Sequence, residues 1–270
     1  MGKGIFITGA SSGLGKAAAK LFAAKGWKVI ATMRKPQNET ELSRLDNVTL
    51  LALDVTNPEE IKQCTQSAIA QAGIDVVFNN AGYGLAGPME AITDEQLVRE
   101  VDTNLLGVIR VTRAFIPYFR EKKSGLFIST TSIGGLVAFP FFSVYHATKW
   151  GLEGWSESMA FELKQFGIGI KTISPGSTKT DFASRSLDVA SLPEYDQVYE
   201  DYIKTFLSPE VMKSLSTPEQ IAAVVYEAAT DGKDKLRYVA GADAQAAYTR
   251  RLEIGDEAFR KEISHLFLKS

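Results

Sequence analysis

Two hydrophobic periods alternate along this chain. Short runs that are almost continuously apolar and rich in β-branched residues predict strands buried on both faces. These runs lie at residues 4–8, 27–32, 48–53, 74–79, 125–131, 168–174 and 236–240. The segments between them repeat their apolar residues at helical spacing, most clearly at residues 14–25, 59–72, 94–119 and 145–166. Strand followed by helix, repeated, predicts an α/β fold with a doubly wound parallel sheet in a single domain, residues 1–270.

One long stretch, residues 181–218, breaks this rhythm. It is mixed in character and carries the aromatic residues Tyr195, Tyr199, Tyr202 and Phe206. It follows a predicted strand end, where open α/β sheets place their binding crevice, and loops this long inside a compact domain are usually functional or mobile. We therefore predict a partly helical substrate lid, followed at residues 243–270 by a helical C-terminal extension.

Composition and charge argue against several classes of protein. Of the 270 residues, 45% are hydrophobic, and the formal net charge is -2, so neither nucleic acid nor an anionic membrane is indicated as a partner. The N-terminal apolar run is too short for a signal peptide, and no stretch approaches the ~18 apolar residues of a membrane span, so we expect a cytoplasmic protein. The one cysteine, Cys64, excludes an intrachain disulfide and is expected in the core. With only His146 and His265, far apart, no metal site is expected.

A glycine-rich turn, TGASSGLG, joins the first predicted strand to the first helix. Gly9 permits a tight turn, Gly13 lets backbone N–H groups approach a pyrophosphate, and Gly15 lets helix and strand pack closely. The helix N-terminus then presents its positive dipole end to the phosphates. Glycine triplets arise by chance, but the position between strand and helix favours a dinucleotide site. The contacts expected from this turn are Gly9, Ser11, Ser12, Gly13, Leu14 and Gly15.

The end of the second predicted strand, ATMR, indicates which dinucleotide is bound. An NAD-binding fold of this kind places an acidic residue there to bind the ribose 2′-OH. In this chain Met33 stands at that position and Arg34 follows it. A carboxylate would repel a 2′-phosphate, whereas a guanidinium pairs with it, so the pattern predicts NADP(H). The alternative is that Arg34 is a solvated residue of a surface turn.

The third predicted strand ends at a carboxylate, Asp54, followed by Val55. A carboxylate at this edge is suited to accept a hydrogen bond from an adenine amino group, so we expect both residues to contact the cofactor. The alternative for Asp54 is capping of the following helix, although Thr56 and Asn57 are better placed for that.

Six motifs in register resemble the short-chain dehydrogenase/reductase family: TGASSGLG, NNAG at 79–82, Asn104, Ser132, Tyr145-x-x-x-Lys149 and Pro175-Gly176. The resemblance runs from residue 4 to about residue 180, returns weakly at 239–244, and omits the lid and the tail. It implies a Rossmann-type fold and an oxidoreductase that moves hydride between NADP(H) and an alcohol or carbonyl compound. It also implies cofactor contacts from Asn80, Ala81, Gly82, Tyr145, Lys149, Pro175, Gly176, Thr178 and Thr180, with Thr178 replacing the family's usual valine or isoleucine.

The spacing of Tyr145 and Lys149 places both side chains on one face of a helix. A nearby ammonium favours tyrosinate, so we expect Lys149 to lower the pKa of Tyr145 from its usual value of about 10. The resemblance implies that Tyr145 gives a proton to the carbonyl oxygen and that Lys149 also binds the nicotinamide ribose. It implies that Ser132 hydrogen-bonds the substrate oxygen and that Asn104 holds a water of the proton relay. The alternatives are a turn-capping hydroxyl for Ser132 and a helix-kinking side chain for Asn104.

Candidate walls of the substrate pocket are the loops at 83–89 and 134–144 and the lid, and they include Phe139, Phe141, Phe142 and the lid tyrosines. The alternative is that these aromatic residues belong to the core, but they lie in predicted loops that flank the catalytic motifs. They predict a mainly apolar pocket and a bulky hydrophobic carbonyl or alcohol substrate. Two alternatives stand beside the oxidoreductase: an epimerase or lyase of the same fold, and a non-catalytic NADP-binding regulator. Epimerases and lyases of this fold belong to a longer branch of the family, which usually carries a T-G-x-x-G-x-x-G turn. Non-catalytic regulators typically lack some of the catalytic residues.

Self-association is expected as well. The helical segment at residues 145–166 carries the large side chains of Trp150, Trp155, Met159 and Phe161. That is more apolar surface than a single buried stripe needs. Together with the resemblance, this predicts a homodimer or homotetramer formed through the segments at 94–119 and 145–166.

Overall fold

The computed structural model describes residues 2–179 and 187–268. A seven-stranded, entirely parallel sheet forms its centre, in the order β3-β2-β1-β4-β6-β7-β9. The strands are β1 Gly4–Ile7, β2 Lys28–Met33, β3 Val48–Ala52, β4 Ile74–Asn79, β6 Gly125–Thr130, β7 Ile168–Pro175 and β9 Arg237–Ala240. Each agrees with its prediction to within one residue at either end. The predicted doubly wound, Rossmann-type α/β fold is therefore confirmed.

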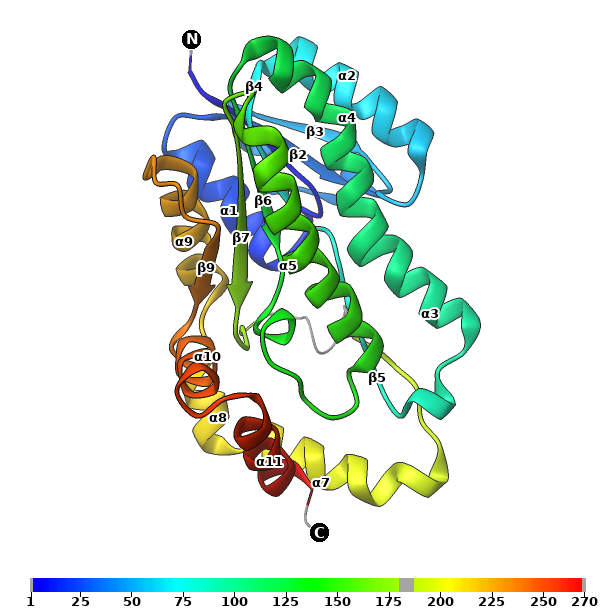
Figure 1. Ribbon diagram of the computed structural model, residues 1–270. Helices are drawn as coiled ribbons and strands as arrows, with labels where there is room; N and C mark the ends of the chain where they lie inside the picture. The colour runs from blue at the N-terminus through cyan, green and yellow to red at the C-terminus, as the bar shows by residue number, and fades with distance from the viewer. Residues whose placement is uncertain (1, 180–186, 269–270) are drawn as a thin grey trace.

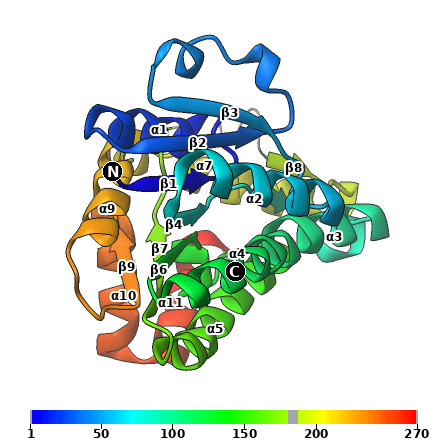
Figure 2. The same cartoon turned by 90° about the horizontal axis from the view of Figure 1, so that it is seen from above.

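Helices cover both faces of the sheet (Figures 1 and 2). The covering helices are α1 Gly13–Ala24, α2 Pro58–Ala72, α4 Gly107–Lys122, α5 Ser143–Lys164 and α9 Pro218–Thr230. α1 and α9 pack on one face, whereas α2, α4 and α5 pack on the other. The first strand shows why the runs are continuously apolar: Ile5 and Ile7 belong to the core under α1, and Phe6 between them belongs to the core under α2 and α4. Cys64 of α2 is buried there, as expected.

The helix predicted at residues 94–119 is interrupted, which corrects that prediction. α3 spans Asp94–Val101, and a five-residue π-helical turn at Asp102–Leu106 separates it from α4. Asn104 lies in this turn, so the interpretation of Asn104 as a residue that distorts its helix agrees with the backbone. π-helical turns inside α-helices are rare and often occur at functional sites.

The lid and the C-terminal extension contain several short elements. A small parallel pair joins β5, Gly84–Ala86, to β8, Leu187–Val189. The helices of this region are α7 Asp196–Phe206, α8 Pro209–Ser214, α10 Ala242–Ile254 and α11 Asp256–Phe267. α11 packs against α7, at the end of the molecule toward which the arrows of β7 and β9 point (Figure 1). None of the helices among the described residues has both the length and the apolarity needed to cross a bilayer.

Candidate active site

The predicted site residues gather at one edge of the sheet, where the parallel strands end. The glycine turn follows β1, Asn80–Gly82 follow β4, Ser132 follows β6, and Gly176 follows β7. Tyr145 and Lys149 project from α5 toward the same edge, since Lys149 Nζ donates a hydrogen bond to the carbonyl of Thr130 at the end of β6 (3.0 Å). Thr180, one of the predicted cofactor contacts, lies outside the described residues.

The glycine turn is a close-packed backbone cradle. Gly9 and Gly13 have φ angles of +68° and +51°, which disfavour any residue with a Cβ atom. A Cβ on Gly15 would lie 2.4 Å from the carbonyl oxygen of Gly9. Ser12, which precedes α1, makes no side-chain capping bond to the first turn within the described part of the chain. The first N–H groups of α1 therefore suit a phosphate, and this backbone fits the pyrophosphate of a dinucleotide.

Thr8, which the motif analysis did not single out, ties this turn to the next strand. Its hydroxyl oxygen accepts hydrogen bonds from the backbone N–H groups of Asn80 (2.9 Å) and Ala81 (3.0 Å). The Asn80 amide in turn donates to the carbonyls of Thr8 and Gly9, at 3.2 Å each. The cradle is thus held in position by hydrogen bonds between β1 and β4. A strand-ending threonine immediately before the glycines was the available signal.

Met33 and Arg34 differ in exposure at the end of β2. The Met33 side chain is only 4% exposed and packs in the core, so this position offers a 2′-OH no polar group. Arg34 is exposed, and no hydrogen bond or ion pair to another described residue engages its guanidinium. It is therefore available to an anion.

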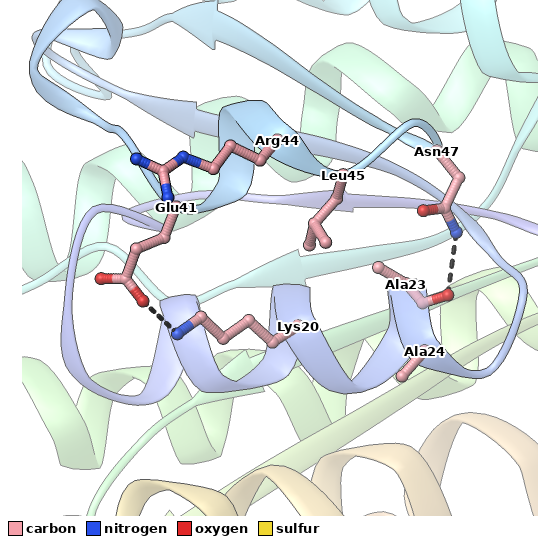
Figure 3. A pocket seen from close by; sticks show the side chains of 7 residues that line it. All are labelled: Lys20, Ala23, Ala24, Glu41, Arg44, Leu45 and Asn47. Atoms are coloured by element: carbon pink, nitrogen blue, oxygen red, sulfur yellow. Dashed lines mark hydrogen bonds and ion pairs between the residues drawn. The ribbon is translucent and has the colours of Figure 1, made fainter.

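The neighbouring lysines of α1 are already paired. Lys16 Nζ lies 3.1 Å from Glu39 and 2.6 Å from Glu41, and Lys20 also pairs with Glu41. Figure 3 shows the Lys20–Glu41 pair beside a hollow of about 450 Å³. That hollow runs along the C-terminal half of α1, away from the strand ends. None of the predicted site residues lines it, so it does not belong to the cofactor cradle.

Asp54 and Asn57, which follow β3, have different hydrogen-bond partners. Asn57 caps α2, because its side chain accepts from the N–H groups of Glu59 and Glu60. Asp54 Oδ1 instead accepts from the N–H (2.9 Å) and the hydroxyl (2.7 Å) of Thr56. The capping alternative for Asp54 is therefore wrong, and its contact with adenine stays a prediction, as does that of Val55.

Tyr145, Lys149 and Ser132 form a close group. Lys149 Nζ lies 5.6 Å from the centre of the Tyr145 ring. The Ser132 hydroxyl oxygen accepts a hydrogen bond from the N–H of Gly134 (3.0 Å). Ser132 therefore caps this turn, as the alternative interpretation expected, and it also lies beside Tyr145. A Cβ on Gly134 would lie 3.2 Å from the Tyr145 ring, so the turn after Ser132 packs directly on the tyrosine.

Burial controls the ionisation of this group. Tyr145 is half-buried, and burial raises its pKa to about 12. The hydrogen bond with Ser132 opposes this increase, and Glu100 adds a smaller increase. Burial also lowers the pKa of Lys149 to about 8, against the opposing effects of Glu100 and Glu153. The expected decrease in the pKa of Tyr145 is wrong for the chain alone, because burial disfavours the charged phenolate.

Asn104 is fixed by two partners. Its Oδ1 accepts from the N–H of Tyr83 (3.0 Å), and its Nδ2 donates to the Tyr83 carbonyl (2.7 Å) and to Glu100 Oε1 (2.9 Å). A Cβ on Gly82 would lie 2.9 Å from Asn104 Oδ1 and 3.8 Å from Lys149 Nζ. Asn104 and Lys149 therefore approach each other beside a residue that must remain glycine.

The segment that follows β7 meets the C-terminal extension at Gly176 and Ser177. Asp243, at the start of α10, accepts a hydrogen bond from the N–H of Ser177 (2.7 Å). A Cβ on Gly176 would lie 2.2 Å from an oxygen of the same carboxylate. Asp243 was not identified from the sequence, because nothing local to residue 243 indicates that it meets residue 177.

An aromatic cluster stands next to Tyr145. It joins the loop after Ser132 to the lid and the tail, and its members are Phe139, Phe141, Phe142, Tyr199, Tyr202, Phe206 and Phe267. The Phe142 ring lies 6.1 Å from that of Tyr145, and the Phe267 ring lies 5.0 Å from that of Tyr202. The sequence identified the lid tyrosines and the loop phenylalanines separately, but not Phe267.

Known proteins resemble this chain over most of its length. Residues 3–189 match the family described as short chain dehydrogenase. An uncharacterized oxidoreductase of Schizosaccharomyces pombe is 38% identical over 84% of this chain and 96% of its own length. The 3-ketodihydrosphingosine reductase of Bacteroides thetaiotaomicron is 36% identical over 75% and 72% of the two chains, and retinol dehydrogenase 8 of Bos taurus is 31% identical over 86% and 80%.

Solved structures give the same result. The crystal structure of a short-chain dehydrogenase from Streptomyces avermitilis superposes with a TM-score of 0.82 at 32% identity, covering 97% of this chain and 96% of that one. A variant of ElxO with NADPH bound superposes with a TM-score of 0.74 at 25% identity, covering 89% of this chain and 96% of that one.

Proposed function

The chain belongs to the short-chain dehydrogenase family, and from this we propose that it is an NADP(H)-dependent oxidoreductase acting on a bulky hydrophobic ketone, aldehyde or secondary alcohol. The observation that carries the proposal is the convergence of Asn104, Ser132, Tyr145 and Lys149 beside the glycine cradle. The complete set argues against a non-catalytic regulator. In this proposal residues 1–270 act as one domain, with the lid and the tail closing over the substrate.

NADPH, when bound, supplies the hydride. Tyr145 holds its proton at the phenol oxygen, because its raised pKa keeps it protonated at neutral pH, and gives that proton to the carbonyl oxygen of the substrate. Ser132 donates a hydrogen bond to the same oxygen and stabilises the charge that develops there. Lys149, anchored on the Thr130 carbonyl, places its ammonium near the ring and stabilises the tyrosinate that remains.

The preference for NADP(H) rests on Arg34. The guanidinium is exposed and unpaired among the described residues, whereas the position of the missing acid is filled by the buried Met33. The pairing of Lys16 with Glu39 and Glu41 leaves Arg34 as the principal cation for a 2′-phosphate. The ElxO neighbour, which has NADPH bound, supports the same cofactor. In this proposal Asp54 and Val55 contact the adenine, and Pro175, Gly176, Thr178 and Thr180 contact the nicotinamide.

The substrate class rests on the aromatic cluster. Aromatic walls beside a proton donor favour a flat or long apolar molecule whose one polar group points at Tyr145. Two relatives are named after such substrates, retinol and 3-ketodihydrosphingosine, which supports this class.

The decisive experiment is a screen of NADPH oxidation by the purified protein against hydrophobic ketones and aldehydes. The same screen with the Tyr145→Phe variant is the matched control, because a contaminating reductase would survive the substitution. Turnover by the wild type alone supports the proposal. NADPH binding without turnover of any carbonyl or alcohol would instead indicate the regulator, and a stereochemical or elimination product without net cofactor use would indicate the epimerase or lyase.

We also propose self-association through the segments at 94–119 and 145–166, which form α3, α4 and α5. Phe161 of α5 is 75% exposed and Trp150 is 41% exposed, large fractions for residues of their size. Arg251 of α10 covers one face of the Trp150 ring, which leaves Phe161 as the more accessible of the two. Light scattering at micromolar concentration tests this: a dimer or tetramer is expected, and a monomer would overturn it.

A further inference from the structure

Glu100 is a fully buried carboxyl group that the proposed reaction does not yet use. It is 0% exposed and lies in the last turn of α3, immediately before the π-helical turn that carries Asn104. Its Oε1 accepts a hydrogen bond from Asn104 Nδ2 (2.9 Å), and its Oε2 has no hydrogen-bond partner among the described residues. A carboxyl group in this environment is costly unless a nearby charge compensates it.

The groups around Glu100 identify that charge. Arg99, the neighbour on its own helix, is already engaged, since it donates to the Tyr83 phenol (3.1 Å) and pairs with Asp188 of β8. The Tyr83 phenol lies close enough to favour the charged form of Glu100, and Asp188 opposes it. From α5, Lys149 favours the charged carboxylate. Lys149 also lies close to the side chain that holds Glu100, since a Cβ on Gly82 would be 2.9 Å from Asn104 Oδ1 and 3.8 Å from Lys149 Nζ. No ion pair among the described residues engages Lys149, so it is the cation that compensates Glu100.

The second carboxylate near Lys149 is already satisfied. Glu153 accepts hydrogen bonds from the hydroxyls of Thr131 (2.6 Å) and Ser174 (3.0 Å), and its other oxygen pairs with Arg237 (2.7 Å). Arg237 offsets the charge of Glu153, so the Glu153 carboxylate stabilises the Lys149 ammonium less than the Glu100 carboxylate does.

We propose that Glu100 is a positioning residue of the catalytic centre: its carboxylate, held by the Asn104 side chain that approaches Lys149, keeps Lys149 as an ammonium and Tyr145 as a phenol, and so extends the reductive reaction to alkaline pH. The inference rests on the proposed function. Asn104 then has a second role, because its side chain binds both the backbone of Tyr83 and the carboxylate of Glu100.

The ionisation of the pair agrees with this arrangement. Burial raises the pKa of Glu100 to about 7, and the Lys149 ammonium opposes that increase. Glu100 in turn opposes the lowering of the Lys149 pKa and adds to the raising of the Tyr145 pKa. Above neutral pH, where Glu100 is charged, both effects retain the proton that reduction consumes. The two groups titrate as a coupled pair.

The variant Glu100→Gln tests the proposal, because glutamine keeps the hydrogen bond from Asn104 and removes the charge. With NADPH and a carbonyl substrate, we expect the alkaline limb of the kcat/KM profile to move to lower pH by roughly one unit, as for loss of a nearby opposite charge. Activity at the acidic end of the profile should stay within about twofold, which corresponds to less than about 0.5 kcal/mol. Asp102→Asn is the matched control: it removes one negative charge from the adjoining turn, where Asp102 pairs with Arg110 at the surface, and it should leave the limb in place.

A second measurement needs no substrate. Nuclear magnetic resonance of protein labelled in its lysine side chains follows the titration of Lys149 directly, with a Lys149→Gln sample to assign the signal. The midpoint should be lower in Glu100→Gln than in the wild type. An unchanged midpoint, or a loss of activity equal at every pH, overturns the inference. A lowered midpoint in a protein that reduces no carbonyl would uphold the charge coupling and reject the proposed function, so the two failures are distinguishable.

Discussion

The cofactor region, residues 2–179, and the lid–tail region, residues 187–217 and 242–268, are held together differently. In the cofactor region, backbone packs on backbone: α1 buries Ala17, Ala18 and Ala19 against the sheet, and Gly15 has no space for a Cβ atom. In the lid–tail region the contacts are made by rings, such as those of Tyr202 and Phe267. Its ion pairs, for example Arg250–Glu262, are half exposed and contribute little.

The difference agrees with what each region is proposed to bind. A pyrophosphate is recognised by backbone N–H groups, which any sequence supplies if the turn has the correct shape, so a few glycines are the main requirement. A hydrophobic substrate is recognised by the shape of side chains, which differs from one enzyme to the next. The family match ends at residue 189, close to where the lid–tail region begins.

The largest effect should come from the residue between the two regions. Tyr145→Phe removes the proton donor but keeps the ring, so kcat should fall by about 10²- to 10⁴-fold, the usual contribution of a general acid. The dissociation constant of NADPH, measured by fluorescence titration, should change little, because the glycine cradle is untouched. Turnover at the wild-type rate would show that Tyr145 is not the acid.

A change at the end of the chain should affect the lid–tail region alone. Phe267 is 7% exposed and packs on Phe139 and Tyr202, so Phe267→Ala should weaken the packing of α11 by about 3 kcal/mol, at the low end of the range for a buried phenylalanine. We expect faster hydrogen exchange in α11 and a higher KM for a bulky carbonyl. The matched control is Leu266→Ala, since the adjacent Leu266 is 57% exposed. An equal loss of NADPH affinity would show that the regions are coupled.

The reverse test changes only the cofactor region. Arg34→Ala should lower the affinity for NADPH by roughly 5- to 150-fold, equivalent to about 1–3 kcal/mol for a charge-assisted hydrogen bond, and leave NADH use nearly unchanged. Arg44→Ala removes another exposed arginine, one that lines the hollow in Figure 3, and should change neither. If Arg34→Ala weakened the binding of NADPH and NADH equally, Arg34 would not be a contact of the 2′-phosphate. Met33→Asp is a poor converse test, because it would place a carboxylate in the core.

The smallest effect concerns the loop that links the regions. His146 Nδ1 donates to the carbonyl of Gly134 (2.6 Å), and Nε2 accepts from the N–H of Phe139 (2.9 Å), so the ring must be neutral. Burial lowers the pKa of His146 below that of the unfolded chain, about 6.5. Below that pH the unfolded state binds more protons, so this contribution to stability is present above pH ~6.5 and is lost as the pH falls.

Chemical unfolding between pH 7 and pH 5 measures this loss. The free energy of unfolding should decrease less steeply with acidification in His146→Asn than in the wild type. The exposed His265 provides the control, and His265→Asn should follow the wild-type slope. Identical slopes for all three proteins would show that His146 does not titrate on unfolding.

The residues alone were enough to predict the sheet, the glycine cradle and the candidate catalytic residues. The seven strands were predictable to within one residue because a strand buried on both faces must be apolar throughout, which is a local property. The spacing of Tyr145 and Lys149 needs only the pitch of one helix. The same local reasoning missed the π-helical turn at Asn104, because the spacing of apolar residues along a helix does not reveal one extra residue in a turn.

The burial and the ionisation of these groups, by contrast, depend on the tertiary structure. The pKa of Tyr145 rises rather than falls because burial in the folded chain disfavours the phenolate. Glu100 lies in a helix with a polar sequence, yet it is completely buried and accepts a hydrogen bond from Asn104. Phe267 meets Phe139 although 128 positions separate them by number. Hydrophobic periodicity is a property of neighbouring residues, whereas the burial and the charge of a side chain depend on which distant segments the fold brings together.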